Sequence, residues 1–214
     1  MEDNEKKGMI VFTKYSPFTV VDVKIENYNG EEYETPRVVS LCRCGQSKNK
    51  PFCDGTHGTV EFNNERLKEK KHEAKAYDGE KITVYYDRYL CKHIGKCTNG
   101  YPEIFDSGRI PWIEQKNETD VDKLIEVIKK CPSGALSYKL ENENRETIYH
   151  DEQKIKIEKN GSINIMGGVK LIDDNKSEDI LDSREHYSLC RCGASKHKPF
   201  CDGTHIDIEF DGQK

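Results

Sequence analysis

The sequence has no long hydrophobic run and is poor in apolar residues. Of its 214 residues, 34% are hydrophobic and an equal 34% are charged. No stretch approaches the roughly 20 apolar residues that a membrane-spanning helix needs. The start, MEDNEKKGMIVF, lacks the apolar segment of a signal peptide. We therefore expect a cytoplasmic protein that does not enter a membrane.

An excess of positive charge is also missing. The formal net charge is −5, which does not favour binding to nucleic acid or to an anionic membrane surface. The sequence shows no Ser/His/Asp set, no phosphate-binding loop and no dinucleotide-binding fingerprint. We therefore expect no catalytic activity that depends on such a site.

So few apolar residues cannot form one large core, and small domains with thin cores usually need metals or disulfides. The nine cysteines are an odd number, which argues against a closed disulfide framework, as does a reducing compartment. They form three groups of three: Cys42, Cys44 and Cys53; Cys91, Cys97 and Cys131; and Cys190, Cys192 and Cys201. Metal binding is the interpretation that uses all nine.

Two of these groups lie in an internal repeat. Residues 40–57 read SLCRCGQSKNKPFCDGTH and residues 188–205 read SLCRCGASKHKPFCDGTH. The two copies differ only where Gln46 is replaced by Ala194 and Asn49 by His197. Such close repetition indicates that the chain builds the same site twice.

Each copy offers three thiols and one imidazole at one spacing, C-x-C, then eight residues, then C-x3-H. The candidate ligands are Cys42, Cys44, Cys53 and His57 in the first copy, and Cys190, Cys192, Cys201 and His205 in the second. This donor set fits a closed tetrahedral zinc site. It fits equally an iron–sulfur cluster in which histidine replaces one thiolate. The ligand chemistry alone leaves both alternatives open.

The repeat resembles the CDGSH iron–sulfur domains, the mitoNEET-like family. Their pattern, C-x-C-x2-S-x3-P-x-C-D-G-[S/T]-H, is matched at every position in both copies, with Thr56 and Thr204 in the usual serine position. The resemblance implies a [2Fe–2S] cluster held by three cysteines and one histidine in each copy. It also implies that two units pair into a β-rich cap, often with exchanged strands. We therefore expect a monomer in which the two units form an intramolecular pseudo-dimer, with two independent units as the alternative.

The third cysteine group resembles a divergent single-cluster bacterial ferredoxin. Cys91 and Cys97 match the outer cysteines of a C-x2-C-x2-C run, and Cys131 matches the remote cysteine that precedes proline. The middle cysteine is missing, and His93 is the nearest alternative ligand. We favour a [4Fe–4S] cluster, which would need a fourth ligand, and His93 is the best candidate for it. Three thiolates alone would hold a [3Fe–4S] cluster, and thiols without a metal remain a further alternative.

These patterns divide the chain into five segments of an α+β protein. We expect CDGSH units at 8–62 and 153–212, an inserted ferredoxin-like unit at 80–140, and charged linkers at 63–79 and 141–152. Within the inserted unit, alternation predicts a strand over 81–87. A stripe of apolar residues predicts a helix over 119–132, with Thr119 as its N-cap and Cys131 at its end.

Other segments receive simpler predictions. The runs at 59–62 and 206–210 alternate in a way that predicts a short strand after each motif. The C-D-G-T-H end of each motif predicts the start of a short helix capped by its aspartate. We expect His72, His150 and His186 to be solvated.

The leading functional hypothesis is a non-catalytic electron-transfer protein with three iron–sulfur centres and an unidentified redox partner protein. An alternative is a cluster carrier or a redox or pH sensor, because a histidine ligand must be neutral to bind iron and is lost in acid. The acceptor would then be an apo-protein. A structural zinc module is the third hypothesis.

Overall fold

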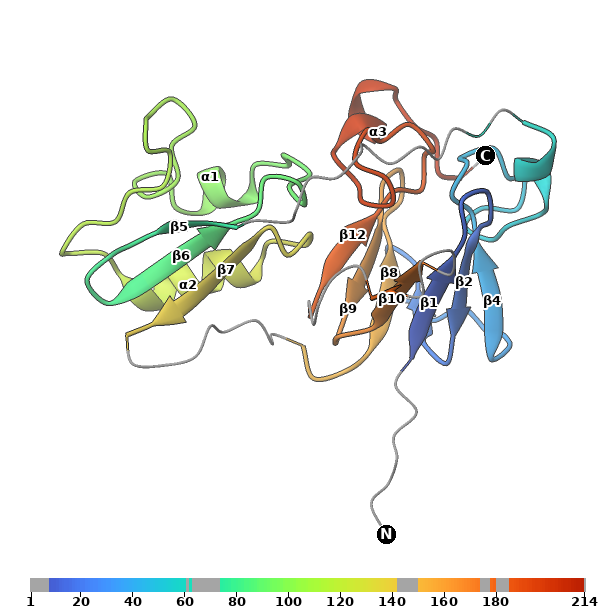
Figure 1. The fold of residues 1–214 in the computed structure, drawn as a ribbon, viewed down its shortest axis with the longest axis horizontal. Helices are drawn as coiled ribbons and strands as arrows, with labels where there is room; N and C mark the ends of the chain where they lie inside the picture. The colour runs from blue at the N-terminus through green and yellow to red at the C-terminus, as the bar shows by residue number, and fades with distance from the viewer. Residues whose placement is uncertain are drawn as a thin grey trace, which may run out of the picture.

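The computed structural model describes residues 8–60, 62, 74–141, 150–173, 178–179 and 185–213. In these residues the protein is a mixed α+β fold of three sheets and a few short helices, as expected. In Figure 1 a green and yellow middle unit lies beside the β-rich part that the two ends of the chain form. No helix in the described residues is long and apolar enough to cross a membrane.

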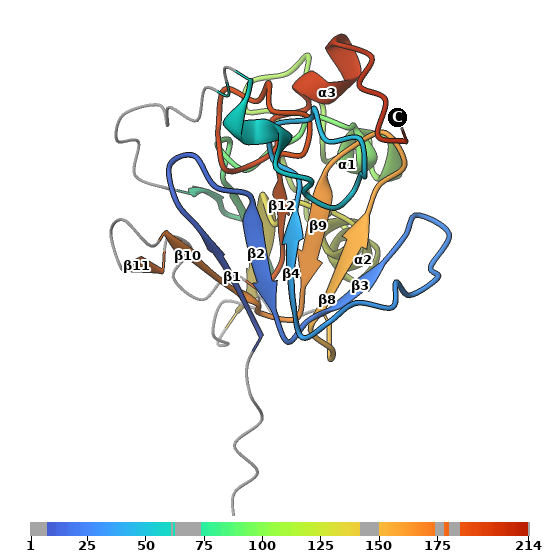
Figure 2. The ribbon, with the colours of Figure 1, turned by 90° about the vertical axis from the view of Figure 1, so that its right-hand side faces the viewer.

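Two sheets make up the β-rich part. The first has the order β11 (Glu178–Asp179), β10 (Lys170–Asp173), β1 (Met9–Phe12), β2 (Phe18–Val21) and β4 (Val38–Leu41). The second has the order β12 (Tyr187–Leu189), β9 (Ile163–Met166), β8 (Lys154–Ile157) and β3 (Lys24–Glu26). Figure 2 shows the two sets of strands beneath the loops that carry the repeated motifs.

Each sheet includes strands from the other half of the chain, β10 and β11 in the first sheet and β3 in the second. Strand β10 pairs in parallel with β1, and β3 pairs in parallel with β8. The remaining ladders of the two sheets, β1–β2, β2–β4, β10–β11, β8–β9 and β9–β12, are antiparallel and stay within one half. The two halves therefore exchange strands through the β1–β10 and β3–β8 pairings.

One core serves both halves. Strand β1 alternates between partly exposed and buried residues, and β8 has the same pattern. Side chains of the two halves meet in one buried cluster, including Ile10 and Ile25 from the first half and Ile155 and Leu171 from the second, all fully buried. Sharing a core compensates for the small number of apolar residues in each half.

The middle unit has its own sheet and core. Strands β5 (Lys75–Tyr77), β6 (Ile82–Tyr86) and β7 (Leu136–Leu140) form the sheet, and α1 (Lys96–Gly100) and α2 (Val121–Lys129) accompany it. Leu124, Val127 and Ile128 of α2 are buried against this unit's core. Strand β6 lies within the predicted strand at 81–87, and α2 lies within the predicted helix.

Several boundaries differ from the sequence prediction. The N-cap of α2 is Asp120, whose carboxylate accepts the N–H of Lys123 at 3.1 Å, while the hydroxyl of Thr119 accepts the N–H of Lys116. Strand β5 lies inside the range 63–79 that the sequence predicts as a linker. Strand β5 is an outer strand of its sheet, and two of its three residues are exposed, as is common for edge strands. Residues 63–73 and 142–149, the larger parts of both predicted linkers, lie outside the described residues.

The strands predicted after the two motifs are not formed in the described residues, and residue 61 lies outside them. Thr59 and Val60 follow the 3-10 turn Thr56–Gly58 without strand pairing, and residues 206–207 belong to helix α3 (Thr204–Asp207). The side chain of Phe210 instead packs against the buried cysteines Cys190 and Cys192 of the second motif. Alternation over four or five residues is too short to distinguish a strand from a turn or a short helix.

Candidate metal centres

Each repeated motif is a loop that folds back onto the strand before it. Backbone N–H groups of Cys42 and Cys53 donate to the carbonyls of Pro51 and Ser40 at 2.9 and 2.8 Å. The same bonds recur in the second copy, from Cys190 to Pro199 and from Cys201 to Ser188, at 2.8 and 2.9 Å. The loop geometry therefore repeats with the sequence.

The aspartate of C-D-G-T-H holds the turn that presents the histidine. Asp54 accepts N–H bonds from Lys48 and Thr56 at 2.8 and 3.0 Å, and Asp202 accepts the corresponding bonds from Lys196 and Thr204. The predicted helical starts are confirmed as a 3-10 turn and as α3, but the N-cap residue of each is the following glycine. Asp54 and Asp202 therefore lie one residue before the N-cap and are not the N-cap residues themselves.

The candidate ligands of each motif lie together in two pairs. In the first motif, Sγ of Cys42 and Cys44 are 3.8 Å apart, and Sγ of Cys53 is 3.2 Å from Nδ1 of His57. The second motif repeats this arrangement, with 3.8 Å between Cys190 and Cys192 and 3.3 Å between Cys201 and His205. Two thiolates on one tetrahedral metal, each about 2.3 Å from it, lie roughly 3.8 Å apart.

The two pairs do not converge on a single ion. A mononuclear tetrahedral site brings all four ligand atoms within about 4 Å of one another. Across the described ranges, the group whose three ligand atoms all lie within 4.8 Å is His150, Glu185 and His186, and no three ligand atoms of either motif meet that limit. The donor geometry therefore fits a centre with two metal atoms, each bound by one pair.

The thiol pairs are arranged to bind a cation. The hydrogen bond with Cys44 lowers the pKa of Cys42 to about 6, and the bond with Cys190 lowers that of Cys192 to about 7. The same hydrogen bond raises the pKa of the partner thiol in each pair, because the two sulfurs share one proton. A metal in place of this proton would hold both sulfurs as thiolates.

Burial differs between the two sites although their ligands match. Cys201 and His205 are 3% and 8% exposed, whereas Cys53 and His57 are only half-buried. Burial and the nearby Lys92 ammonium lower the pKa of His205 and favour the neutral imidazole that can bind a metal.

The two motifs touch each other through their glycines. Gly45 and Gly193 have φ of 76° and 79°, in the left-handed region where a side chain is strained. A Cβ on Gly193 would lie 2.5 Å from the carbonyl oxygen of Cys44, and one on Gly45 would meet the carbonyl of Cys192. Only glycine permits this approach of the two ligand loops.

An arginine between the paired cysteines anchors each ligand loop. The spacing of the cysteines and histidines did not predict this role. Arg43 is 3% exposed and donates to the carbonyls of Thr13 and Ser16. Arg191 is 1% exposed and donates to the carbonyls of Glu158 and Gly161, the corresponding loop of the second half. The C-R-C spacing in both copies is the signal that could have identified them.

The middle unit brings its three cysteines to one cavity. Cys91, Cys97 and Cys131 line a pocket of about 650 Å³, together with His93. His93 has φ of 53°, in the left-handed region that is uncommon for residues other than glycine, and its Nδ1 is 3.7 Å from Sγ of Cys91. Burial raises the pKa of Cys91, and burial with the nearby Cys131 raises that of Cys97 to about 11. Three thiolates here would need a cationic centre to compensate their charge.

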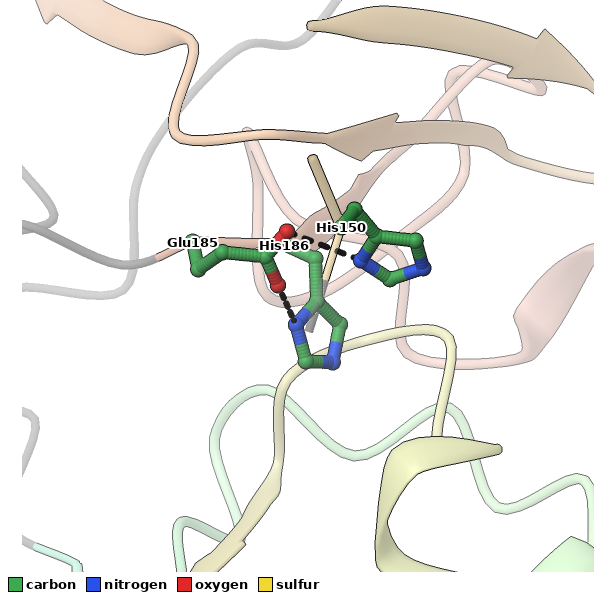
Figure 3. A group of neighbouring side chains, drawn as sticks. All are labelled: His150, Glu185 and His186. Atoms are coloured by element: carbon green, nitrogen blue, oxygen red, sulfur yellow. Dashed lines mark hydrogen bonds and ion pairs between the residues drawn. The ribbon is translucent and has the colours of Figure 1, made fainter. Parts of the chain in front are cut away.

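A network of His150, Glu185 and His186 (Figure 3), which the sequence did not predict, braces the turn at Cys131. The carboxylate oxygens of Glu185 lie 2.8 and 2.6 Å from Nδ1 of His150 and Nδ1 of His186, within hydrogen-bond distance, and Nε2 of His186 lies 2.8 Å from the carbonyl oxygen of Cys131. His186 is therefore buried rather than solvated, at 4% exposure, and His150 is half-buried; His72 lies outside the described residues. Burial opposes charge on Glu185, but the two histidine hydrogen bonds lower its pKa to about 2.

Comparison with known proteins agrees with this division of the chain. The family model "Iron-binding zinc finger CDGSH type" matches residues 16–58 and 160–206, and the model "Divergent 4Fe-4S mono-cluster" matches residues 77–141. Over 65 residues the chain is 45% identical to the uncharacterized protein YjdI of Escherichia coli strain K12, covering 84% of that protein and 30% of this chain. YjdI of strain O157:H7 matches equally. No solved structure matches the chain.

The donor sets and both family models agree that the chain binds iron–sulfur centres. The chain belongs to the CDGSH iron–sulfur family, with two CDGSH units on either side of a divergent 4Fe-4S mono-cluster unit.

Proposed function

We propose that this protein carries electrons through three iron–sulfur centres and is not itself an enzyme. The observation that carries the proposal is the pairing of ligand atoms in each CDGSH motif, Cys with Cys and Cys with His, at distances suited to two metals rather than one. A bound cluster would supply one-electron chemistry, and the protein supplies its ligands, burial and hydrogen bonds.

The two CDGSH sites each hold a [2Fe–2S] cluster in this proposal. Cys42 and Cys44, or Cys190 and Cys192, bind the buried metal, and Cys53 and His57, or Cys201 and His205, bind the other. The middle site holds a [4Fe–4S] cluster on Cys91, Cys97 and Cys131, with His93 as fourth ligand. The supporting observation is that all four side chains line one cavity.

The architecture proposed for this function is an intramolecular pseudo-dimer. The exchanged strands β3 and β10 and the shared core support it, since each half is incomplete without the other. The ferredoxin-like unit is inserted between the halves, near residues 80–140, and the chain acts as a monomer in the cytoplasm. The redox partner is another protein rather than nucleic acid or a membrane.

A redox titration of the anaerobically purified protein tests the proposal. Dithionite should reduce the CDGSH centres, with bleaching of the visible spectrum, and air should restore the spectrum without loss of iron. Replacing Cys91 by serine should damage the middle centre and leave the CDGSH signals in place. Reduction that releases the iron irreversibly would contradict an electron carrier.

Cluster transfer is a second candidate function, and one observation favours it. Cys53 and His57 of the first site are half-buried, whereas their counterparts are buried. A metal bound by the less buried pair Cys53 and His57 would be more accessible to an apo-acceptor protein than a metal at the second site. Transfer of an intact cluster to an apo-ferredoxin, faster than electron exchange, would favour this function over the relay.

A further inference from the structure

Lys92 is a buried lysine that the middle unit inserts into the second CDGSH unit. Its side chain is 1% exposed, and its ammonium donates to Oε1 of Glu158 at 2.8 Å and to Oγ of Ser162 at 2.7 Å. Burial opposes charge on Glu158, but Lys92 outweighs it and lowers the pKa of the carboxyl to about 2. Lysines are almost never buried without such a partner. Its sequence neighbours are candidate ligands of the middle site, so Lys92 belongs to that site's loop.

The same residue reaches the second CDGSH site. Gly203, in the C-D-G-T-H turn, has φ of 94°, and a Cβ there would lie 2.5 Å from the carbonyl oxygen of Lys92. A Cβ on Gly161 would meet Oε2 of Glu158 and would lie 3.2 Å from Nε2 of His205. The Lys92–Glu158 ion pair is therefore next to the histidine ligand of the second site.

Among the described residues, the first half has no counterpart of the polar group formed by Lys92, Glu158, Ser162 and Asn164. The loop after β1 corresponds to the loop after β8, because the equivalent arginines bind equivalent carbonyl groups. Arg43 donates to the carbonyl of Thr13, and Arg191 donates to the carbonyl of Glu158, so Thr13 corresponds to Glu158. The loops after β1 and β8 have equal length. Thr13, Pro17 and Thr19 therefore stand where Glu158, Ser162 and Asn164 stand. In the part of the chain that the structure describes, nothing lies within 4 Å of a Cβ built on Gly55, the counterpart of Gly203.

A second contact docks the middle unit on the same copy of the motif. The rings of Tyr89 and His197 stack with centroids 4.6 Å apart and planes 10° apart, and Nδ1 of His197 lies 3.0 Å from the carbonyl oxygen of Tyr89. The first copy has Asn49 at this position, and it is exposed. One of the two differences between the copies is thus a docking residue for the middle unit.

We infer that Lys92 is a positioning residue through which the middle unit tunes the second CDGSH site and leaves the first untuned. The inference rests on the proposed redox function. Reduction adds one negative charge to a cluster, and a buried ammonium nearby stabilises that charge. Lys92 therefore raises the midpoint potential of the second site, and Glu158 lowers it. Two sites with identical ligands differ because only one of them receives this charge pair.

Spectroelectrochemical titration of the loaded, full-length protein tests this assignment. The variants His57→Cys and His205→Cys identify which signal belongs to which CDGSH site. Lys92→Met should lower the reduction equilibrium constant of the second site about tenfold, which is about 59 mV for one electron. The first site should change less than twofold. Lys196→Met is the matched control, since it removes the same charge from an exposed lysine of the second motif.

Two further variants separate charge from structure. Glu158→Gln should raise the second site's potential, and Lys92→Met combined with Glu158→Gln should return it to within about threefold of the parent's reduction equilibrium. If Lys92→Met fails to fold, the direction of the Glu158→Gln shift decides alone. Equal shifts at both sites, or an unmoved second site, would overturn the inference. A parent protein without iron and sulfide would instead overturn the proposed function with it.

Discussion

In the proposed function, His57 and His205 are the residues that set the acid lability of the CDGSH sites. A neutral imidazole binds iron, but it competes with a proton of ordinary pKa about 6.5. Replacing His57 and His205 by cysteine should lower the midpoint potential, flatten its dependence on pH and slow bleaching at pH about 5 roughly tenfold, because anionic thiolate replaces the protonatable imidazole. Stopped-flow absorbance checks the bleaching rate. A double variant that bleaches as fast as the parent would show that these histidines are not the labile ligands.

Glu185 is the residue on which the brace at Cys131 depends. The pKa of Glu185 in the folded protein, about 2, lies below its ordinary value of 4.5, so its contribution to stability is complete above pH 4.5 and is lost as pH falls toward 2. Glu185→Gln should lower the free energy of unfolding at pH 7 by about 1–3 kcal/mol, because it weakens two buried hydrogen bonds to a charged group, and the difference should shrink below pH 4.5. Denaturant titration measures this. The exposed Glu152→Gln should change stability by less than about 0.5 kcal/mol; an equal loss in both variants would contradict the brace.

At the scale of elements, the two C-D-G-T-H turns form a matched pair. Gly55 and Gly203 have φ of 89° and 94°, so alanine strains both turns alike. Only Gly203→Ala also meets the carbonyl of Lys92, and it should cost about 1–3 kcal/mol more than Gly55→Ala. Thermal unfolding of the loaded proteins compares the two. An equal loss of stability in the two variants would mean that Lys92 of the middle unit does not contact the turn at Gly203.

The local elements were predictable, and their contacts with distant segments were not. Cysteine spacing located both ligand loops, and periodicity located β6 and α2, because these signals lie within a few residues of each other. The burial of Lys92 and His186 depends on partners more than 50 residues away, at Glu158 and Cys131. No local pattern encodes such partners. The difference between Asn49 and His197 was visible, but its cause, the stack on Tyr89, required the fold.

At the scale of the whole molecule, strand exchange within one chain predicts the assembly. Strands β3 and β10 are already paired with the opposite half, so the chain has no need of a second copy to complete its sheets. Sedimentation velocity should give a monomer of 24.7 kDa over a wide range of concentrations. A stable dimer that survives dilution would indicate that the halves pair between chains.

The central claim, three iron–sulfur centres in one chain, is tested most directly by metal and sulfide analysis of anaerobically purified protein. Two [2Fe–2S] centres and one [4Fe–4S] centre predict about eight irons and about eight acid-labile sulfides per chain, with about seven irons if the middle centre is [3Fe–4S]. The visible spectrum should show sulfur-to-iron charge-transfer bands. Stoichiometric zinc without inorganic sulfide would contradict the account.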